Sequence, residues 1–275
     1  MARSSSDLLH PRGAAPGPAE ALTWRVVVDG PGSGARNMAL DHALAECLEE
    51  GTAVLRLYSW DAPTVSFGRN EPARTRYDRG VPAARTLGFV RRPTGGRAVL
   101  HDREVTYAVV APLRAFGGLR DAYRAINDGL VAGLTALGVP AVASTDGIVA
   151  PVDAGPCFRH PAPGEVVAGG RKLVGSAQAR VAGALLQHGS VILDGDQAPL
   201  AAMAPDGDAW EPPATVTALV DPAPSATAVV EALLRGCRLA WGGTWAESEY
   251  ASLELATADR LEESRYARGD WTWRR

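Results

Sequence analysis

Lysine is almost absent from this chain: Lys172 is the only lysine among the 28 basic residues, and all the others are arginine. An ammonium is a compact charge that can point one donor at one oxygen, whereas a guanidinium is a wide planar fork. The lone lysine is therefore either an incidental surface residue or a group that does something an arginine cannot do. Its surroundings in the sequence bear on this choice.

Cysteine is also scarce. Cys47, Cys157 and Cys237 are too few and too far apart for a disulfide framework, and no Cys/His spacing is typical of a zinc site. A reducing compartment, the cytoplasm, is the expected location.

No apolar run approaches the roughly 20 residues that span a bilayer, and the N-terminus has no apolar segment of the secretory type. The net charge of −3 excludes a basic footprint for nucleic acid and a polybasic membrane signal. We therefore expect neither nucleic acid nor a membrane as partner. The hydrophobic content of 46% in 275 residues is ordinary for a globular protein with a sizeable core.

The pattern of apolar residues and turn signals predicts one domain with strands and helices. Residues 1–22 are rich in Ser, Pro, Gly and Ala and are expected to be a disordered tail, which leaves 23–275 as the single domain. Helices are expected at 37–50, with Asn37 as N-cap, at 118–138, and as two closing helices at 226–241 and 246–266. Expected strands are 24–28, a hairpin of 54–60 and 64–67, then 89–92, 98–102 and 105–111, and an antiparallel meander of 165–167, 172–180 and 185–193. Residues 144–164 are expected to be irregular, and 205–224 to be a proline-rich linker.

A glycine pair stands in the turn Thr94-Gly95-Gly96. Without side chains, backbone N–H groups there can approach an anion closely. Four cationic or titratable residues lie within about ten positions of this turn, which is unusual for a simple turn. An ordinary turn between strands is the simpler interpretation, and an anion or acyl site is the functional one. These four neighbours are Arg91, Arg92, Arg97 and His101.

Cys157 is flanked by Pro156 and Phe158, with His160 three positions on. Nucleophilic catalysis by cysteine requires the thiolate, which nearby positive groups favour. Candidates for that positive group are His160, Lys172 and His188. His188 could equally be a structural histidine on a strand, and Ser176 and Gln178 could merely complete hydrogen bonds in the meander. The chain has no Gly-x-Ser-x-Gly elbow, no Walker loop and no paired-carboxylate spacing.

Several blocks of sequence resemble the biotin/lipoate protein ligase and octanoyltransferase superfamily. The closest likeness is to the octanoyltransferases of lipoate assembly that are related in sequence to lipoate ligases. Cys157-Phe158 stands where those enzymes keep their acyl-accepting cysteine, some fifteen residues before the lysine. The matching blocks are 37–41, 58–68, 91–102, 170–178, 186–190 and 265–271, so the likeness runs from about residue 24 to the end.

The resemblance implies an α/β (α+β) fold: a mixed, mostly antiparallel sheet with packed helices, related to class II aminoacyl-tRNA synthetases and biotin protein ligases. It also implies transfer of octanoyl from octanoyl-acyl carrier protein to a lysine of an apo lipoyl domain. The acceptor would be the glycine cleavage H protein or a 2-oxoacid dehydrogenase E2, with Cys157 as thioester carrier and Lys172 as donor to the acyl carbonyl. No cofactor or metal is implied. The implied substrate-binding residues are Arg92, Thr94, Gly95, Gly96, Arg97, His101, Gly175, Ser176, Ala177, Gln178 and His188.

The chain departs from the superfamily pattern at three positions. Arg97 stands where ligases usually have a third glycine, which favours a transferase. His42 replaces a commonly acidic residue, and Glu71 replaces a usual glutamine. Two alternatives stay open. In an ATP-dependent lipoate or biotin ligase, Lys172 would hold the acid and the α-phosphate, and modification would require ATP. A non-catalytic scaffold for lipoyl domains or acyl chains would be indifferent to Cys157→Ala.

Overall fold

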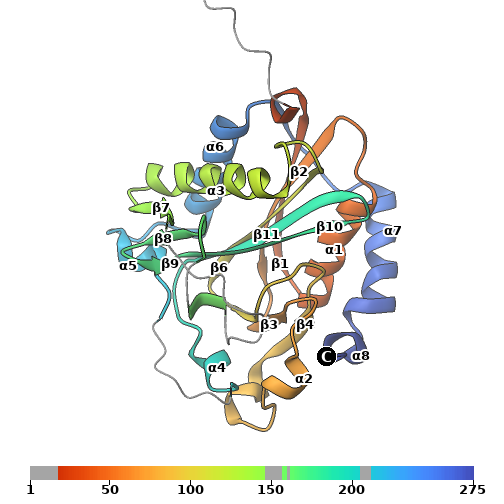
Figure 1. Ribbon diagram of the computed structural model, residues 1–275, viewed down its shortest axis with the longest axis vertical. Helices are drawn as coiled ribbons and strands as arrows, with labels where there is room; N and C mark the ends of the chain where they lie inside the picture. Colours follow the sequence, from red (N-terminus) through yellow and green to blue (C-terminus); the bar gives the residue numbers. More distant parts are fainter. Residues whose placement is uncertain (1–17, 146–156, 160–161, 205–211) are drawn as a thin grey trace, which may run out of the picture.

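The computed structural model describes residues 18–145, 157–159, 162–204 and 212–275. A six-stranded sheet with the order β10-β11-β6-β2-β1-β12 is the centre of the fold (Figure 1). The pairs β10–β11, β11–β6 and β6–β2 are antiparallel, whereas β1 is parallel to both β2 and β12. The expected mixed, mostly antiparallel sheet is therefore confirmed. Its strands are β1 (Thr23–Gly32), β2 (Thr52–Trp60), β6 (Glu104–Pro112), β10 (Val174–Val181), β11 (Ala184–Ile192) and β12 (Thr244–Glu247).

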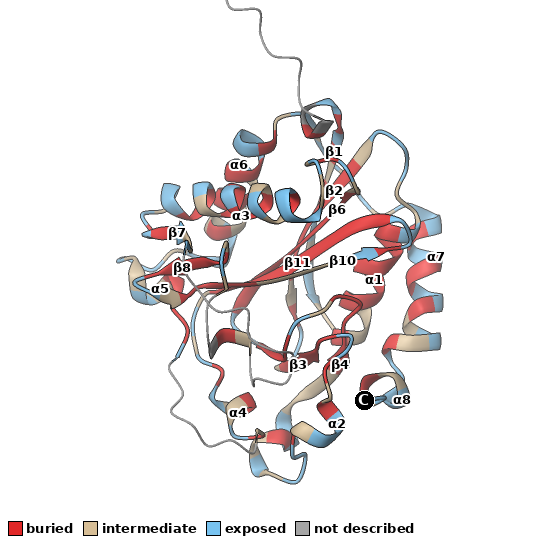
Figure 2. Ribbon diagram, in the orientation of Figure 1, coloured by how far each residue is buried: buried red, intermediate tan, exposed pale blue. Residues whose placement is uncertain are grey.

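Helices cover both faces of this sheet. On one face lie α3 (Leu119–Ala136) and α6 (Ala226–Trp241), and on the other lie α1 (Gly34–Glu46) and α7 (Ser252–Leu261). Strands covered on both faces need apolar residues on both, and β11 is accordingly buried along its whole length (Figure 2). The central strands thus provide a rigid, dry base for side chains that point out of the sheet.

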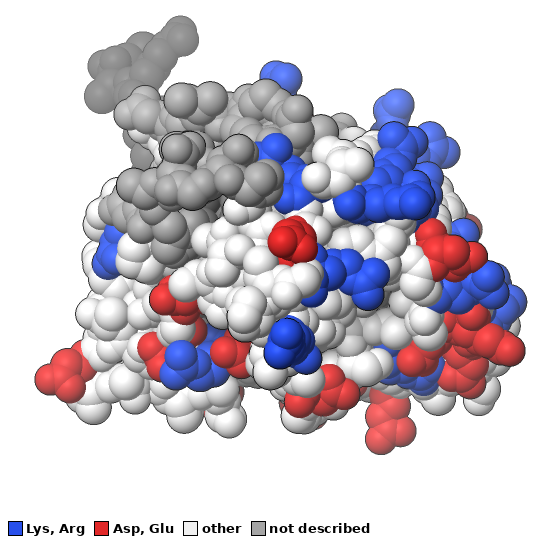
Figure 3. Space-filling view, turned by 90° about the horizontal axis from the view of Figure 1, so that it is seen from below, with Lys and Arg blue, Asp and Glu red and all other residues white. Residues whose placement is uncertain are grey.

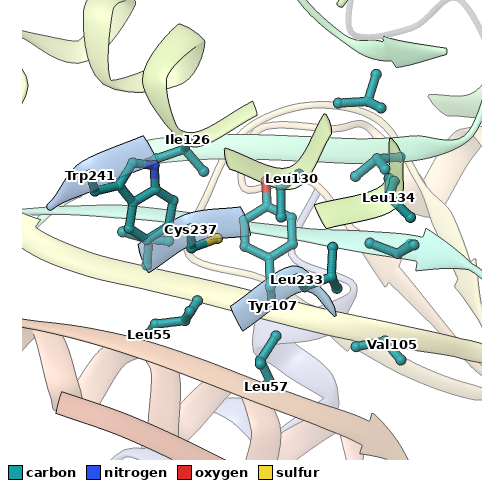
Figure 4. Packing of buried hydrophobic residues seen from close by; sticks show 14 of the residues in the cluster. Leu55, Leu57, Val105, Tyr107, Ile126, Leu130, Leu134, Leu233, Cys237 and Trp241 are labelled. Atoms are coloured by element: carbon teal, nitrogen blue, oxygen red, sulfur yellow. The ribbon is translucent and has the colours of Figure 1, made fainter. Parts of the chain in front are cut away.

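The layer between the sheet and α3/α6 holds the larger apolar core (Figure 4). Ile126 and Leu130 of α3 and Leu233 of α6 meet Leu55 of the sheet there. The two helices cross backbone to backbone, because a Cβ on Gly236 would lie 2.3 Å from the amide nitrogen of α3 Gly133. This contact fixes the position of α3, which also contacts β10.

Two three-stranded sheets carry the loops near the site. The first has the order β4-β3-β5 and contains β3 (Thr64–Phe67), β4 (Gly88–Arg91) and β5 (Val99–His101). The second has the order β7-β8-β9 and contains β7 (Ala141–Ala143), β8 (Val166–Ala168) and β9 (Arg171–Lys172). The expected meander forms antiparallel pairs, but it is divided between this sheet and the central one. The short helices are α2 (Ala73–Arg76), α4 (Ala198–Ala201), α5 (Val216–Leu219) and α8 (Gly269–Thr272), and Glu262–Tyr266 continues α7 as a π-helical turn.

The expected hairpin of 54–60 and 64–67 is wrong. β2 pairs with β1 and β6 in the central sheet, while β3 pairs with β4 and β5. All four residues of β3 are buried. A strand buried on both faces needs partners on both edges, which a two-stranded hairpin does not supply.

The start of α1 also differs from the prediction. The helix begins at Gly34, and the Ser33 hydroxyl caps it by accepting a hydrogen bond from the amide of Arg36 at 3.1 Å. Asn37 is instead buried, and its amide nitrogen donates to the carbonyl oxygens of Gly32 and Ser59. Asn37 therefore ties the helix to the strands on either side of it rather than capping it.

The C-terminal prediction of one helix over 246–266 is wrong as well. Its first residues belong to β12, which pairs with β1 at the edge of the sheet before α7 begins. Trp245 stacks on Trp24 of β1 with ring centroids 4.9 Å apart. This stacking gives the short run a strand partner that its own periodicity does not reveal.

Parts of the expected tail and linker are ordered. Pro18–Ala21 forms a 3₁₀ helix and Leu22 is buried, so the expectation of disorder is wrong there; residues 1–17 lie outside the described part. In the expected linker, 205–211 lie outside the described residues, but Ala214 is buried and its amide donates to the Lys172 carbonyl at 3.0 Å. This part of the segment thus packs against β9, the strand that contains Lys172. Among the described residues no helix has both the length and the apolarity to cross a bilayer.

Candidate active site

Lys172 lies between the thiol of Cys157 and the carboxylate of Glu165. Its Nζ is 3.2 Å from Cys157 Sγ and 2.6 Å from Glu165 Oε1, and its side chain is fully buried. Two left-handed glycines, Gly169 and Gly170, turn β8 back into β9 so that Val167 pairs with Lys172. Glu165 is two residues from that partner and therefore on the same face of the hairpin.

Lys172 is held in its charged form. Burial by itself would lower the pKa of the ammonium, but the sulfur of Cys157 and the carboxylate of Glu165 more than offset this and raise the pKa above its usual value. A compact positive charge therefore persists beside the sulfur at neutral pH. Such a charge stabilises a thiolate or a developing oxyanion.

The backbone of Cys157 is anchored from three directions. Its amide donates to the Ala98 carbonyl at 2.9 Å, and its own carbonyl accepts from Lys172 Nζ and from Arg97 Nη2, both at 3.3 Å. The Phe158 ring packs so closely on Gly175 that a Cβ there would lie 2.8 Å from it. The backbone of Cys157 is thus held by the segment before β5, by β9 and, through Phe158, by β10. His160, the other candidate neighbour, lies outside the described residues.

A narrow cavity opens at Cys157. It holds about 410 Å³ of space, including the solvent-filled space at its mouth. Its walls are mostly apolar, with Val99, Met38 and Trp60 among them. The remaining lining residues are Tyr58, Ser66, Arg92, Gly96, His101, Thr106, Cys157, Gly175, Ser176, Ala177, His188, Gly189 and Ser190.

The glycine loop is held from inside by a buried guanidinium. Arg92 Nη2 donates to the carbonyl oxygens of Gly95 and Arg97, both at 2.7 Å, and Nη1 donates to the Ser66 carbonyl at 2.9 Å. Arg91 acts similarly, with Nη1 at 2.6 Å from the Gly68 carbonyl. Gly96 has a φ of +82°, a conformation that a residue without Cβ adopts freely.

The interpretation of Arg91 and Arg92 as part of an anion site at the glycine turn is therefore wrong. Both are buried, and Nε and Nη1 of Arg91 and all three nitrogens of the Arg92 guanidinium donate to main-chain carbonyls. A tight loop outside the sheet leaves its carbonyls without strand partners, and the guanidinium fork supplies several donors at once. Arg97 is also buried and contacts the Cys157 carbonyl.

Glu71, the departure noted in the sequence, belongs to the same scaffold. Its carboxylate accepts from the amides of Gly68 and Ala98, at 3.0 and 2.9 Å, and from the Tyr77 hydroxyl at 2.7 Å. Burial raises the pKa of Glu71, although Arg92 and these donors oppose the shift. The residue joins the two ends of the segment that carries the glycine loop.

His188 also lines the cavity and has a different chemical environment from Lys172. Its Nδ1 is 2.8 Å from Asp41 Oδ2 and its Nε2 is 2.6 Å from the Thr94 hydroxyl. Burial lowers the pKa of His188 by more than Asp41 raises it, so the imidazole is neutral at pH 7. Burial would raise the pKa of Asp41, but His188 and Arg56 lower it further, so the carboxylate stays charged. Thr94 is therefore positioned by a neutral histidine.

His101 forms a second polar contact on the cavity wall. Its Nε2 is 2.7 Å from the Ser66 hydroxyl, its Nδ1 is 2.8 Å from Glu104 Oε1, and its ring stacks on Trp60 with centroids 3.9 Å apart. The stack closes part of the wall with two flat, rigid groups.

The structure brings most of the candidate residues to this cavity. Thr94, Gly95 and Arg97 lie behind its wall rather than on it, as does Lys172. Gln178 is half-buried and is not among the lining residues. Among the described residues, no group of three or more His, Cys, Asp or Glu side chains is arranged to hold a metal ion. The candidates that do line the cavity are Arg92, Gly96, His101, Gly175, Ser176, Ala177, His188 and Cys157.

Sequence reasoning missed Glu165, Asp41 and Trp60. For Glu165 a signal existed, because it is the only acidic residue from 165 to 193 and precedes Lys172 by seven residues across a Gly-Gly turn. Asp41 and His188 are far apart in the chain, and nothing in the local pattern of either pairs them.

Comparison with known proteins agrees with the family resemblance that the sequence blocks predict. The model of the lipoyl protein ligase A/B catalytic domain matches residues 33–237. Octanoyltransferase LipM of Kyrpidia tusciae is 41% identical, over 92% of this chain and 99% of that protein, and LipM of Brevibacillus brevis is 35% identical with the same coverage.

Solved structures agree. A lipoate-protein ligase A bound with ATP superimposes with a TM-score of 0.78 at 26% identity, over 92% of this chain and 99% of that one. A bi-partite lipoate protein ligase from Thermoplasma acidophilum, described with its E2 lipoyl domain, has the same fold, with a TM-score of 0.73 at 24% identity over 92% and 96% of the chains. The expected resemblance is confirmed: this chain belongs to the lipoyl protein ligase A/B catalytic domain family.

Proposed function

We propose that this chain is an acyltransferase that moves an octanoyl group from octanoyl-acyl carrier protein to a lysine of an apo lipoyl domain, in lipoate biosynthesis. The observation that carries the proposal is the 3.2 Å contact of Lys172 Nζ with Cys157 Sγ at the mouth of a mostly apolar cavity. The relatives named octanoyltransferase LipM support the acyl group and the reaction class. Residues 23–275 would act as one catalytic domain.

In the first step the Cys157 thiolate attacks the thioester carbonyl of the donor. The carbonyl oxygen becomes negative in the tetrahedral intermediate, and Lys172 is the nearest donor to it. The carrier thiolate then leaves and takes a proton, while octanoyl remains on Cys157 as a thioester. One thioester replaces another, so the step needs no ATP.

In the second step the acceptor lysine, as the free amine, attacks the thioester on Cys157. The amide forms, the amine loses its proton to solvent, and the Cys157 thiolate returns to its place beside Lys172. Conversion of a thioester to an amide is downhill, and the ammonium again stabilises the oxyanion. Glu165 keeps that ammonium charged and aimed in both steps.

The cavity would hold the acyl chain. Gly96, Gly175 and Ala177 let the chain lie close to the backbone, and His101 and His188 shape the walls. Arg92, Thr94, Gly95 and Arg97 act on the substrate through the loop that they form or hold. Ser176 lines the cavity, and its hydroxyl is 2.7 Å from the Tyr107 hydroxyl. We retain a substrate-binding role for Gln178, which lies two residues further along β10.

The lipoyl-domain acceptor is expected to be the glycine cleavage H protein or a 2-oxoacid dehydrogenase E2. A solved relative is described with its E2 lipoyl domain, which supports the class of acceptor. Because Cys157 must be a free thiol, the reducing cytoplasm is the expected setting.

The test is a transfer assay with purified protein, octanoyl-acyl carrier protein and apo H protein, followed by mass spectrometry of the acceptor. Without ATP, the wild type is expected to octanoylate the acceptor, and Cys157→Ala is expected to be inactive. Modification that appears only with ATP and free octanoate or lipoate, and that survives Cys157→Ala, would replace this proposal with the ligase. No turnover in any mixture would favour a scaffold.

A further inference from the structure

A second hollow lies beside the glycine loop and has a different character from the acyl cavity. It is open to solvent and holds about 750 Å³ of space between the β10–β11 turn, the loop and the C-terminal segment. Four of its side chains are arginines, from three separate stretches of the chain. We call these four, Arg69, Arg180, Arg265 and Arg274, the arginine groove; the other lining residues are His42, Glu46, Pro93, Val181, Ala182 and Trp271.

The charge of the arginine groove is not balanced by acidic side chains. Across residues 18–145, 157–159, 162–204 and 212–275, none of its four arginines forms an ion pair with Asp or Glu. The carboxylate in the groove, Glu46, is engaged by Arg260 at 2.5 Å and by His42 Nε2 at 3.3 Å. Asp270, in the adjoining hollow, pairs with Arg268 at 2.7 Å. Arg265 Nη1 lies 3.4 Å from His42 Nδ1 and Arg274 Nη2 donates to the Arg69 carbonyl, but no carboxylate of the described residues neutralises the four guanidinium groups.

These arginines are also held close together. The guanidinium groups of Arg265 and Arg274 both lie over the Trp271 ring, at 4.9 and 3.9 Å from its centroid. Arg274 Nη2 donates to the Arg69 carbonyl at 2.6 Å. Partial burial and the neighbouring arginines lower the pKa of Arg274, and burial together with Arg265, Arg260 and Arg69 lowers that of His42 to about 4. Like charges gathered in this way are destabilising unless an anion joins them.

The groove and the acyl cavity share one loop. The amide of Arg69 donates to the Thr94 carbonyl at 2.8 Å, Pro93 lines the groove, and Gly96 lines the cavity. On the facing strand, Ala177 lines the cavity and Val181 lines the groove, four residues or about 13 Å further along the same face of β10. A ligand bound in the groove would thus have a short path to Cys157.

The surface view is consistent with a local basic region. In Figure 3, Lys and Arg side chains gather at the upper right of the face seen from below, whereas Asp and Glu lie mainly toward its right and lower edges. Because the Lys172 side chain is fully buried, this surface charge comes from arginine. Guanidinium groups match phosphate and carboxylate oxygens in a bidentate manner.

We propose that the arginine groove is the docking surface for the acyl donor, an acidic carrier domain whose arm is attached through a phosphodiester. The arginines bind that phosphodiester and the carboxylates around it, and the arm passes the glycine loop to bring its thioester to Cys157. This inference rests on the proposed function, since it names the surface that serves the same thiol.

The test compares two donors in single-turnover acylation of Cys157: octanoyl-acyl carrier protein, and octanoyl-pantetheine, which has neither the protein nor the phosphodiester. Arg180→Glu and Arg69→Glu reverse two exposed side chains that make no ion pair in the described chain. Each is expected to lower kcat/KM for the carrier protein about tenfold, and both together about a hundredfold, with a weaker dependence on salt. Acylation by octanoyl-pantetheine should be unchanged.

Arg235→Glu on the exposed side of α6 is the matched control and should act like the wild type with both donors. Loss of transfer to the apo lipoyl domain from preformed octanoyl-Cys157, with normal acylation by the carrier protein, would assign the groove to the acceptor and overturn the proposal. So would equal rates of the variants and the wild type with the carrier protein. If octanoyl-pantetheine and the carrier protein both fail to acylate the wild type, it is the proposed function that fails.

Discussion

Two buried carboxylates near the acyl cavity each hold a basic side chain, with different results. Glu165 holds an ammonium, Lys172, in its charged form beside the Cys157 thiol. Asp41 holds a neutral imidazole, His188, against the Thr94 hydroxyl. On the first side the charge is presented to the reacting atoms. On the second side the charge of Asp41 is paired with Arg56 inside the protein. Its effect is to fix the positions of His188 and Thr94.

The comparison teaches why the single lysine stands where it does. Both sides bury a carboxylate with a cation, but Arg56 is wrapped by oxygen acceptors while Lys172 points one donor at a sulfur. An arginine in place of Lys172 would spread its charge and donors over a wide planar fork, whereas the ammonium aims one compact charge at the sulfur from 3.2 Å.

Lys172→Met should produce the largest effect, because it removes the charge presented to the reaction. We expect kcat/KM for Cys157 acylation to fall about 10²–10³-fold, the cost of one oxyanion donor. Lys172→Arg should recover little of this loss, since charge alone is not sufficient. The measurement is single-turnover acylation, with circular dichroism as the check on folding. Wild-type rates in Lys172→Met would remove the functional difference between the two sides.

Asp41→Asn should be the largest effect on stability. It leaves Arg56 with Asp29 as its acidic partner and gives His188 a neutral amide in place of its carboxylate partner. We expect a loss of about 3 kcal/mol in the free energy of unfolding, the lower part of the range for breaking a buried ion pair. Urea denaturation measures it. Acylation by the folded fraction should fall far less than in Lys172→Met, and an equal fall would show that both carboxylates serve the chemistry.

His42, the residue after Asp41, is a second buried histidine whose lowered pKa can be tested through the pH dependence of stability. His42 accepts a hydrogen bond from the Tyr266 hydroxyl or donates to it at 2.8 Å, and burial with nearby arginines lowers its pKa to about 4. A depressed histidine pKa means that the unfolded chain binds a proton first as pH falls below about 6.5, so stability is lost toward low pH. Between pH 7.5 and 4.5 this loss is about 2.5 kcal/mol.

His42→Gln should remove that part of the pH dependence. Glutamine keeps a polar partner for Tyr266 and does not titrate, so the variant should lose about 2.5 kcal/mol less than the wild type between these pH values. Denaturant unfolding at both pH values measures the difference. Parallel losses in the two proteins would show that His42 already carries a proton in the fold.

Glu165→Gln should give the smallest effect at neutral pH and a larger one in alkali. Without the carboxylate, burial acts on Lys172 with less opposition, so the pKa of the ammonium falls. Acylation should then decrease as pH rises, to roughly tenfold below the wild type at pH 9. Glu165→Asp keeps the charge and should restore most of the alkaline rate. A flat profile in Glu165→Gln would mean that another group keeps Lys172 charged.

The sequence was most informative where local patterns carry the structure. The apolar spacing of 118–138 and 226–241 and the antiparallel pairs at Gly169-Gly170 and Gly183 are local signals, and the elements formed as predicted. The partners of β3 and the strand β12 are set by contacts with distant strands. For that reason periodicity alone placed β3 in a hairpin and β12 in a helix.

The site shows the same division. Cys157, Lys172 and the glycine loop could be found from their own neighbours and from the family resemblance. The pairing of Asp41 with His188 joins residues 147 positions apart. Arg91 and Arg92 were misread because their acceptors are main-chain carbonyls, which every residue carries and no sequence pattern displays.

The central claim, that Cys157 carries the acyl group beside Lys172, is tested most directly by intact-mass analysis of the enzyme itself. The protein is mixed with octanoyl-acyl carrier protein without ATP, sampled over time, and then given apo lipoyl domain. The account predicts one octanoyl group, mapped to Cys157, that disappears from the enzyme as the acceptor gains it. An acceptor octanoylated at the wild-type rate by Cys157→Ser, or a label on any other residue, would contradict it.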